Sequence, residues 1–220
     1  MKKYLLIGNG IAGTTAAEQI RKHDPDGQIT LLTKESLPLY SRIRLPDYLC
    51  GKIDETGLVV KNQEWHDKNN IRLMTGTEIK RLDCQGKKVF SSNGDIFEFD
   101  ELLLATGSNS FVPPIKGKDQ TNVMTLRNLD DAKALVEINS NIKNMVIIGG
   151  GVLGLEAAAA LIQDAIKITV VEYCDRLLPR QLDYEGAKHL QILLEKMGFI
   201  FRLGEETEEI IGKDSAKDSA

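Results

Sequence analysis

The chain has 220 residues, a formal net charge of −4, 42% hydrophobic and 27% charged residues. This composition is typical of a soluble globular protein, and it excludes a collagen, a low-complexity chain and a disordered chain. Lys and Arg number 28 against 32 Asp and Glu, so no basic excess attracts nucleic acid or anionic lipid, and neither is expected as a partner.

The cysteines and the apolar runs indicate the compartment. Cys50, Cys84 and Cys174 form no CxxC pair, which argues against a disulfide scaffold and against a thiolate metal site. Glycines interrupt the apolar runs at 4–7 and 145–162, so neither run predicts a signal peptide or a membrane-spanning helix. We expect a soluble protein of the reducing cytoplasm without a metal site.

The first predicted elements in chain order form a βαβ unit. The apolar run Tyr4–Ile7 predicts a buried strand, the alanine-rich stretch after Gly13 predicts a helix, and Gln28–Leu32 predicts a second strand. Helical stretches are expected within 41–68. Short strands with glycine turns between them predict an antiparallel meander, followed by one buried strand; their ranges are 77–82, 88–91, 96–99 and 101–105.

The first unit recurs downstream. The sequence YLLIGNGIAGTTAAEQI near the start is matched by MVIIGGGVLGLEAAAAL at 145–161, and each copy is followed by a β-rich run. Tyr184–Met197 then has the apolar spacing of a helix that stops at Gly198, and Phe199–Leu203 predicts another strand. Two βαβ units this far apart indicate two nucleotide-binding lobes rather than a short-period solenoid.

The predicted fold is therefore α/β, with two Rossmann-like dinucleotide-binding lobes. Each lobe is expected to have three layers around a parallel sheet, and the meander is inserted in the first. The stiff stretch Val112–Gly117 is the expected crossing between them. This places an N-terminal dinucleotide-binding lobe at 1–112 and an incomplete second lobe at 113–220, whose tail from Lys213 is expected to be frayed.

Two GxGxxG fingerprints carry the chemistry. Gly8 permits a tight turn, Gly10 lets the backbone approach a diphosphate, and Gly13 lets the helix pack against the strand. The helix N-terminus then offers free N–H groups to the phosphates. A tight βα turn without a ligand is the alternative interpretation of one copy, and the second copy weakens it. The equivalent residues there are Gly149, Gly151 and Gly154.

Acidic residues follow both copies. Glu172 ends the second apolar run 23 residues after Gly149, close to the ~20 expected of a carboxylate on a ribose 2′-OH, which favours NADH over NADPH. Arg176 and Arg180 nearby leave NADPH open. Glu35 is the corresponding candidate in the first copy, and a solvated strand end is the alternative for either acid.

Four segments carry a family resemblance: Leu102–Gly117, Leu126–Leu135, Pro38–Lys52 and Val170–Gly186. Together they resemble the pyridine nucleotide-disulfide oxidoreductases, and within them the NADH:rubredoxin oxidoreductases and the flavin module of nitrite reductase large subunits. The resemblance covers the chain to about residue 210. In that family the chain continues past this point, which implies that the present chain is C-terminally truncated.

The resemblance implies FAD at the first fingerprint and NAD(P)H at the second. Arg42 and Arg127, placed beside the flavin by resemblance, equally fit surface arginines on sequence alone. The small residues at 105–107 also make physical sense where a ligand approaches closely. The residues expected at FAD are Gly8, Gly10, Gly13, Glu35, Arg42, Ile79, Ala105, Thr106, Gly107 and Arg127. Those expected at NAD(P)H are Gly149, Gly151, Gly154, Glu156 and Glu172.

A redox thiol is not expected. The disulfide reductases of the family have a CxxxxC pair beside the flavin, whereas this chain has only Cys50 in the corresponding region, and Ile43 stands where the single-cysteine branch has its redox cysteine. No catalytic side chain is predicted, and the three histidines, His23, His66 and His189, are expected at the surface.

These features together favour an FAD-dependent NADH oxidoreductase that passes electrons to an external acceptor such as rubredoxin. The flavin module of a nitrite reductase is one alternative, and a non-catalytic dinucleotide-binding fragment is another. The sequence does not distinguish the acceptor or the oligomeric state.

Overall fold

The computed structural model describes residues 1–139, 142–162 and 166–212, so the expectation for the tail from Lys213 lies outside the described residues. The chain divides into two compact units. Unit 1 comprises Met1–Ser41 and Glu55–Ser108, and unit 2 comprises Arg42–Asp54 and Asn109–Ala220. The segment Arg42–Asp54 thus belongs by its contacts to unit 2, and the predicted lobes, 1–112 and 113–220, remain a prediction about cofactor-binding domains.

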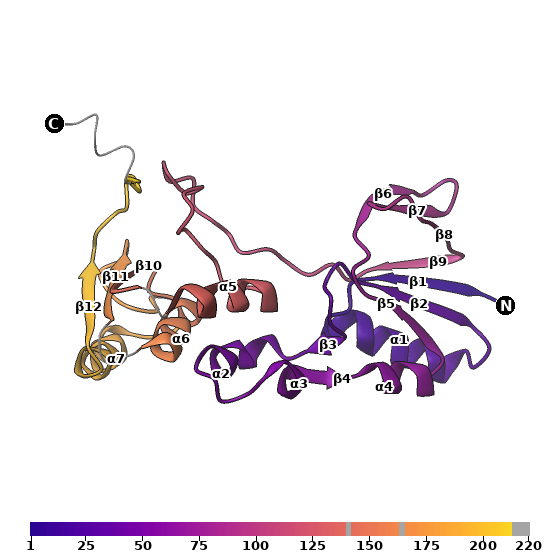
Figure 1. The fold of residues 1–220 in the computed structure, drawn as a ribbon, viewed down its shortest axis with the longest axis horizontal. Coiled ribbons are helices and arrows are strands. Elements are labelled where there is room, and N and C mark those ends of the chain that lie inside the picture. Colours follow the sequence, from indigo (N-terminus) through magenta and orange to yellow (C-terminus); the bar gives the residue numbers. More distant parts are fainter. Residues whose placement is uncertain (140–141, 163–165, 213–220) are drawn as a thin grey trace. The chain divides into compact units, whose positions relative to one another are not determined.

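Unit 1 is built on a four-stranded parallel sheet in the order β5-β2-β1-β9 (Figure 1). The strands are β1 (Lys3–Ile7), β2 (Gln28–Leu32), β5 (Ile71–Met74) and β9 (Glu101–Leu104). Helices α1 (Ile11–His23) and α4 (Gln63–Lys68) supply Ala17 and Trp65 to a buried cluster on one face of this sheet. Apolar side chains alternate between the two faces, as period-2 strands require.

The meander covers the other face of that sheet (Figure 1). It consists of β6 (Ile79–Asp83), β7 (Lys88–Ser91) and β8 (Ile96–Glu98), which pair antiparallel. Val89 of β7 is fully buried with Leu5 and Leu32 of the sheet. Unit 1 therefore has three layers, and a short helix α3 (Glu55–Leu58) and a small hairpin of β3 (Leu39–Tyr40) and β4 (Val59–Lys61) complete it.

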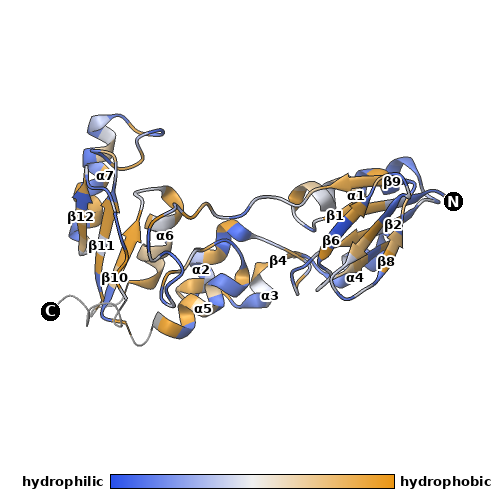
Figure 2. Ribbon diagram, turned by 90° about the horizontal axis from the view of Figure 1, so that it is seen from above, coloured by the Kyte–Doolittle hydropathy of each residue, from blue (hydrophilic) through white to orange (hydrophobic). Residues whose placement is uncertain are grey.

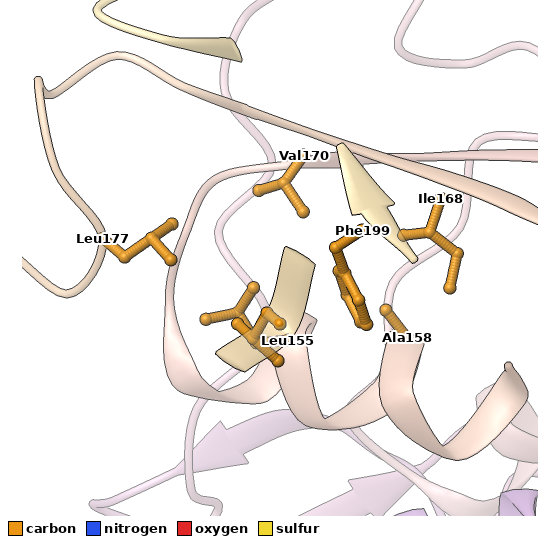
Figure 3. Close-up of a cluster of buried hydrophobic side chains, with 7 residues drawn as sticks. Leu155, Ala158, Ile168, Val170, Leu177 and Phe199 are labelled. Atoms are coloured by element: carbon orange, nitrogen blue, oxygen red, sulfur yellow. The ribbon is translucent and has the colours of Figure 1, made fainter. Parts of the chain in front are cut away.

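Unit 2 repeats the parallel arrangement on a smaller scale. Its strands are β10 (Asn144–Ile148), β11 (Lys167–Glu172) and β12 (Phe199–Leu203), and α6 (Val152–Leu161) and α7 (Tyr184–Lys196) pack on one face. Leu155, Val170 and Phe199 lie in their shared core, and Leu177 enters it from the loop after β11 (Figure 3).

Three further elements of unit 2 pack beside this core. Helix α5 (Leu129–Asn139), the 3₁₀ turn η1 (Arg42–Arg44) and helix α2 (Leu45–Leu49) come from different parts of the chain. Helix α2 contacts both α5 and α6, and its Leu45 and Leu49 are buried.

The opposite face of the unit 2 sheet is exposed within the described residues. Strands β10 and β11 are largely hydrophobic (Figure 2), yet Val146 is 60% exposed and Ile148 42% exposed. One helical layer is therefore present in this unit, where the sequence predicted a layer on each face.

Two segments of unit 2, around residues 116 and 209, pair through a short parallel bridge. Lys116 pairs with Glu209, the backbone N–H of Ile210 donates to the Lys116 carbonyl at 2.8 Å, and the two charged side chains form an ion pair at 2.7 Å. Gly117 has φ +82°, and a Cβ atom there would lie 2.0 Å from the Ile210 carbonyl oxygen. Position 117 therefore requires glycine, because a side chain would clash with the Ile210 backbone.

The fold class predicted from the sequence is confirmed, since both fingerprints follow a strand of a parallel sheet and open a helix. One expectation is wrong: His66 is fully buried rather than at the surface, because the α4 turn places its ring in the core edge next to Trp65. Among the described residues, no helix combines the length and the apolar character needed to cross a membrane.

Candidate functional sites

Gly8 is fixed by the protein itself. Its φ is +115°, a backbone conformation that residues other than glycine rarely adopt. Its N–H donates to the Leu32 carbonyl at 2.8 Å. A Cβ atom there would lie 2.1 Å from the carbonyl oxygen of Ala105, and one at Gly13 would lie 1.9 Å from the carbonyl oxygen of Gly8. The turn, the end of β9 and helix α1 are therefore packed without room for a methyl group.

Gly10 differs from its two neighbours in the motif. It is the N-cap of α1, and a Cβ atom there would meet no described protein atom within 4 Å. Within the described chain no side chain caps this helix end, and its first turn has no acidic residue. Free N–H groups and the positive end of the helix dipole thus face open space, which is the arrangement that holds a phosphate.

Asn9 adds an unsatisfied donor beside this helix end. The residue is only 8% exposed, and its Oδ1 accepts a hydrogen bond from Thr14 Oγ1 at 2.8 Å. Its Nδ2 has no hydrogen-bond partner among the described residues. A buried amide donor without a partner costs free energy, so a bound anion would satisfy both it and the helix end.

The segment after β2, which contains Glu35, is hydrogen-bonded to the segment that precedes Ile79. The backbone N–H of Gly76 donates to the Glu35 carbonyl at 3.0 Å, and that of Thr77 donates to the Thr33 carbonyl at 2.7 Å. Ile79 begins β6 directly afterwards and packs at the edge of the meander core. The Glu35 carboxylate accepts a hydrogen bond from the Tyr40 hydroxyl at 2.5 Å.

The other predicted residues of unit 1 follow β9. The N–H of Ala105 donates to the Ile7 carbonyl at 2.8 Å, which holds Ala105 against Gly8. Thr106 and Gly107 are exposed beyond it, and Gly107 has φ +73°. The structure therefore brings Ala105 to the first fingerprint.

The second fingerprint repeats the geometry of the first. The N–H of Gly149 donates to the Val171 carbonyl at 2.8 Å, as that of Gly8 does to Leu32. Gly151 is the N-cap of α6 and, like Gly10, has no described protein atom within 4 Å of an added Cβ. The two cradles differ at the first and third glycines. A Cβ at Gly149 would meet no described atom within 4 Å, and one at Gly154 would lie 3.0 Å from the Ile147 side chain and 3.6 Å from the Gly149 carbonyl oxygen.

Glu172 is bonded to this fingerprint. Its Oε2 accepts from the N–H of Gly150 at 2.5 Å and its Oε1 from the N–H of Cys174 at 2.7 Å. Two backbone donors fix the orientation of the carboxylate. Glu156, the other acid predicted in this unit, is exposed on α6.

Gly150 and Leu177 are site residues that the sequence analysis missed. A Cβ at Gly150 would lie 2.8 Å from Leu177 Cδ2 and 3.2 Å from Glu172 Oε2. The middle glycine of the motif is therefore needed because the loop after β11 packs on it. The run of three glycines was the available signal, but the motif itself leaves that position free.

Arg42 and Arg127 lie together in unit 2. The Nη1 of Arg42 donates to the Arg127 carbonyl at 3.2 Å, and the Arg127 N–H donates to Asp131 Oδ2 at 2.7 Å. Asn128 and Asp131 also exchange side chain to backbone hydrogen bonds, which fixes the start of α5 as a capping box does. The two arginines predicted beside the flavin are thus held as a pair.

This fold defines a protein of two Rossmann-like units of the dinucleotide-binding kind, each with an open cradle at a glycine N-cap. The chain belongs to the pyridine nucleotide-disulphide oxidoreductase family, which it matches over residues 2–219. The predicted family is confirmed, and with it the prediction of an oxidoreductase whose family uses FAD and NAD(P)H.

Within this family, the chain is similar to several curated reductases and oxidases. The chain is 38% identical over 97% of its length to a nitrite reductase [NAD(P)H] of Bacillus subtilis, of which it covers 27%. It is 33% identical over 98% of its length to an NADH oxidase of Methanocaldococcus jannaschii, of which it covers 50%. It is 30% identical over 96% of its length to a rubredoxin-NAD(+) reductase of Pseudomonas putida, of which it covers 55%. The chain therefore spans about a quarter to a half of these relatives.

Two solved structures bear on the coenzyme. The water-forming NADH oxidase of Lactobacillus brevis, bound to NADH, is 25% identical with a TM-score of 0.89, and the match covers 97% of this chain and 49% of that one. An engineered NADPH oxidase made from it, bound to NADPH, is 25% identical with a TM-score of 0.87 and coverages of 95% and 48%. Its five substitutions replace a glycine, an aspartate, an alanine, a methionine and a proline, and two of the new residues are arginines.

Proposed function

We propose that this chain is the FAD- and NADH-binding part of a cytoplasmic flavin-dependent oxidoreductase that passes electrons from NADH to an external acceptor such as rubredoxin. The observation that carries the proposal is the duplicated cradle: Gly10 and Gly151 each cap a helix whose N–H groups face open space. Bound FAD would supply the redox chemistry, namely taking a hydride from NADH and passing electrons to the acceptor.

The chain's own residues hold and orient the two coenzymes. The N–H groups of the α1 N-terminus and the Asn9 amide would bind the FAD diphosphate, with Glu35 on its ribose. The α6 N-terminus would bind the diphosphate of NADH, with Glu172 on the adenosine ribose. The pair of Arg42 and Arg127 would lie beside the flavin, where positive charge stabilises the reduced ring.

A test of the first site uses the purified 220-residue chain. FAD binding is measured by calorimetry, and the bound flavin is then mixed with NADH under anaerobic conditions while its absorbance is followed. We expect stoichiometric FAD and bleaching by NADH. Binding without bleaching would instead indicate a non-catalytic dinucleotide-binding fragment, and no binding of either coenzyme would contradict the proposal.

Asn9→Asp is the sharpest variant for that site. The aspartate keeps an oxygen for the Thr14 hydroxyl, so the fold is retained, but it removes the unpartnered donor and adds a negative charge. We expect FAD affinity to fall by at least about tenfold, since charge-assisted hydrogen bonds are worth about 1.5–3 kcal/mol. Asn9→Ser, which is neutral, should lose less.

The second candidate function is the flavin module of a nitrite reductase, favoured by the 38% identity to the Bacillus subtilis enzyme. The two candidates differ in the acceptor, so the reduced flavoprotein is mixed with oxidised rubredoxin. Rapid reoxidation of the flavin supports the rubredoxin-type function. Slow reoxidation by rubredoxin, together with fast reoxidation by the iron–sulfur part of a nitrite reductase, supports the second candidate.

A further inference from the structure

The loop after β11 holds an arginine in place. Within the chain, the Nη1 of Arg176 lies 3.3 Å from Asp175 Oδ1, and its Nη2 donates to the Pro179 carbonyl at 3.1 Å. Its guanidinium lies 4.3 Å from the centre of the Tyr184 ring, and the Tyr184 hydroxyl donates to Asp175 Oδ2 at 2.8 Å. We call this arrangement of Asp175, Pro179 and Tyr184 around Arg176 the arginine clasp.

The clasp is anchored rather than loose. Leu177, the residue after Arg176, is fully buried in the unit 2 core (Figure 3). It also packs against Gly150, where an added Cβ would lie 2.8 Å from Leu177 Cδ2. The Arg176 side chain is only 25% exposed, although arginine side chains on surfaces usually extend into water. Tyr184 begins α7, so its ring is positioned by a helix. The guanidinium is therefore held by a carboxylate, a carbonyl and an aromatic face at once.

The clasp begins three residues after Glu172, the residue proposed to bind the adenosine ribose. Glu172 ends β11 four positions before Arg176, and both its oxygens accept backbone N–H groups. Burial raises the pKa of the Cys174 thiol, the Glu172 and Asp175 carboxylates raise it further, and Arg176 lowers it. The charges of Glu172, Asp175 and Arg176 therefore all act on the Cys174 thiol.

The engineered NADPH oxidase points to the same loop. Its substituted aspartate lies eighteen residues after its substituted glycine, and its substituted proline lies seven residues after the aspartate. Gly154, Glu172 and Pro179 have the same spacing here. The new arginines of that mutant fall, by this register, at Tyr173 and Pro179, on either side of Arg176.

We propose that the arginine clasp determines coenzyme choice in this chain by withholding Arg176 from a 2′-phosphate. The inference rests on the proposed function, because it requires the adenosine of NADH to bind at Glu172. A guanidinium with free donors binds phosphate through two parallel hydrogen bonds and offsets a nearby carboxylate. Asp175 and Pro179 engage Nη1 and Nη2 of Arg176, the Asp175 carboxylate balances its charge, and its Nε is buried without a partner among the described residues. Fewer donors and less net charge are therefore left for a phosphate.

The test is calorimetric and needs no flavin turnover. The full 220-residue chain is titrated with ADP-ribose and with 2′-phospho-ADP-ribose. Asp175→Asn removes the charge opposite Arg176, and the same loss of charge at the exposed Glu185 (Glu185→Gln) is the matched control on α7. We expect Asp175→Asn to raise the affinity for 2′-phospho-ADP-ribose about tenfold, as one charge-assisted hydrogen bond gives, and to change that for ADP-ribose less than about twofold.

Two further variants separate the clasp from a general charge effect. Tyr184→Phe keeps the ring but loses the hydroxyl that orients Asp175, and it should give a smaller gain in the same direction. Adding Arg176→Ala to Asp175→Asn should abolish the gain. The clasp is refuted if Asp175→Asn behaves like Glu185→Gln, or if the gain survives Arg176→Ala. Absence of ADP-ribose binding to the unmodified chain would instead overturn the proposed function, and this inference with it.

Discussion

Substituting alanine at Gly8 and at Gly10 should impair different properties: stability at Gly8 and FAD binding at Gly10. Gly8→Ala forces a side chain into a backbone with φ +115° and places its Cβ 2.1 Å from the Ala105 carbonyl oxygen. Strained backbone costs about 1–3 kcal/mol and overpacking about 1–3 kcal/mol, so we expect the free energy of unfolding to fall by about 2–6 kcal/mol. That is a large part of the roughly 5–15 kcal/mol that holds a domain together.

Gly10→Ala meets no described protein atom within 4 Å and keeps an extended N-cap backbone. Alanine is a poorer N-cap than glycine, so the cost to stability should be only about 0.5–1 kcal/mol. The new methyl group occupies the cradle, however, and displaces a diphosphate from the helix N–H groups. We expect FAD affinity to fall by at least about tenfold, the equivalent of one lost charge-assisted hydrogen bond.

Both effects can be measured on the same samples. Trp65 is the only tryptophan of the chain and lies in unit 1 on α4, so its fluorescence during urea denaturation reports the unfolding of the unit that contains both glycines. FAD binding is measured by calorimetry in the absence of urea. If Gly10→Ala binds FAD within twofold of the unmodified chain, the open space at this N-cap does not hold the diphosphate and the reasoning fails.

Gly151→Ala should weaken ADP-ribose binding by at least about tenfold while FAD binding, measured by calorimetry in parallel, stays unchanged; equal loss of both would contradict separate sites. Gly117→Ala should destabilise unit 2 through its clash with the Ile210 carbonyl, seen as faster protease cleavage near residue 210 with an unchanged Trp65 fluorescence transition. Burial lowers the pKa of His66, whose Nδ1 contacts the Asn62 carbonyl at 2.8 Å, so the unfolded chain takes up a proton more readily than the folded one. Stability should therefore fall as pH drops below about 6.5, the ordinary histidine value. Urea midpoints at several pH values should lose this component in His66→Gln and keep it in the control His189→Gln.

Elements with strong local signals were predictable from the sequence. The Asn93-Gly94 pair fixes a turn, and the strand predicted at 88–91 is found as β7 at those residues. The helix from Tyr184 ends near Gly198 because that glycine adopts φ +95°, which stops a helix. In these cases the residues of the segment itself determine the structure.

Elements that depend on distant partners were missed. Strand β5 has four residues after an Asn-Asn turn, and it forms because β2 offers it a parallel edge and Ile71 can be buried there. His66 looks like a surface residue on a short polar helix, yet the packing of that helix against the sheet buries it. Neither outcome has a signal in the local sequence, because each depends on how a segment packs after the chain has collapsed.

The same limit applies within the sites, where one motif has two different surroundings. The bond from the first glycine reaches Leu32 in one copy and Val171 in the other, so the residue structurally equivalent to Glu172 is Thr33, and Glu35 lies two positions further along. Glu172 is therefore held by the fingerprint's own Gly150, whereas Glu35 is held by Tyr40 from outside the motif. Counting residues from the glycines identifies an acid in both copies. It cannot show that the two carboxylates have different hydrogen-bond partners. In the proposed NADH site the position of the Glu172 carboxylate depends on Gly150 of the glycine loop. We therefore expect a change in that loop to alter ribose binding at the second site and not at the first.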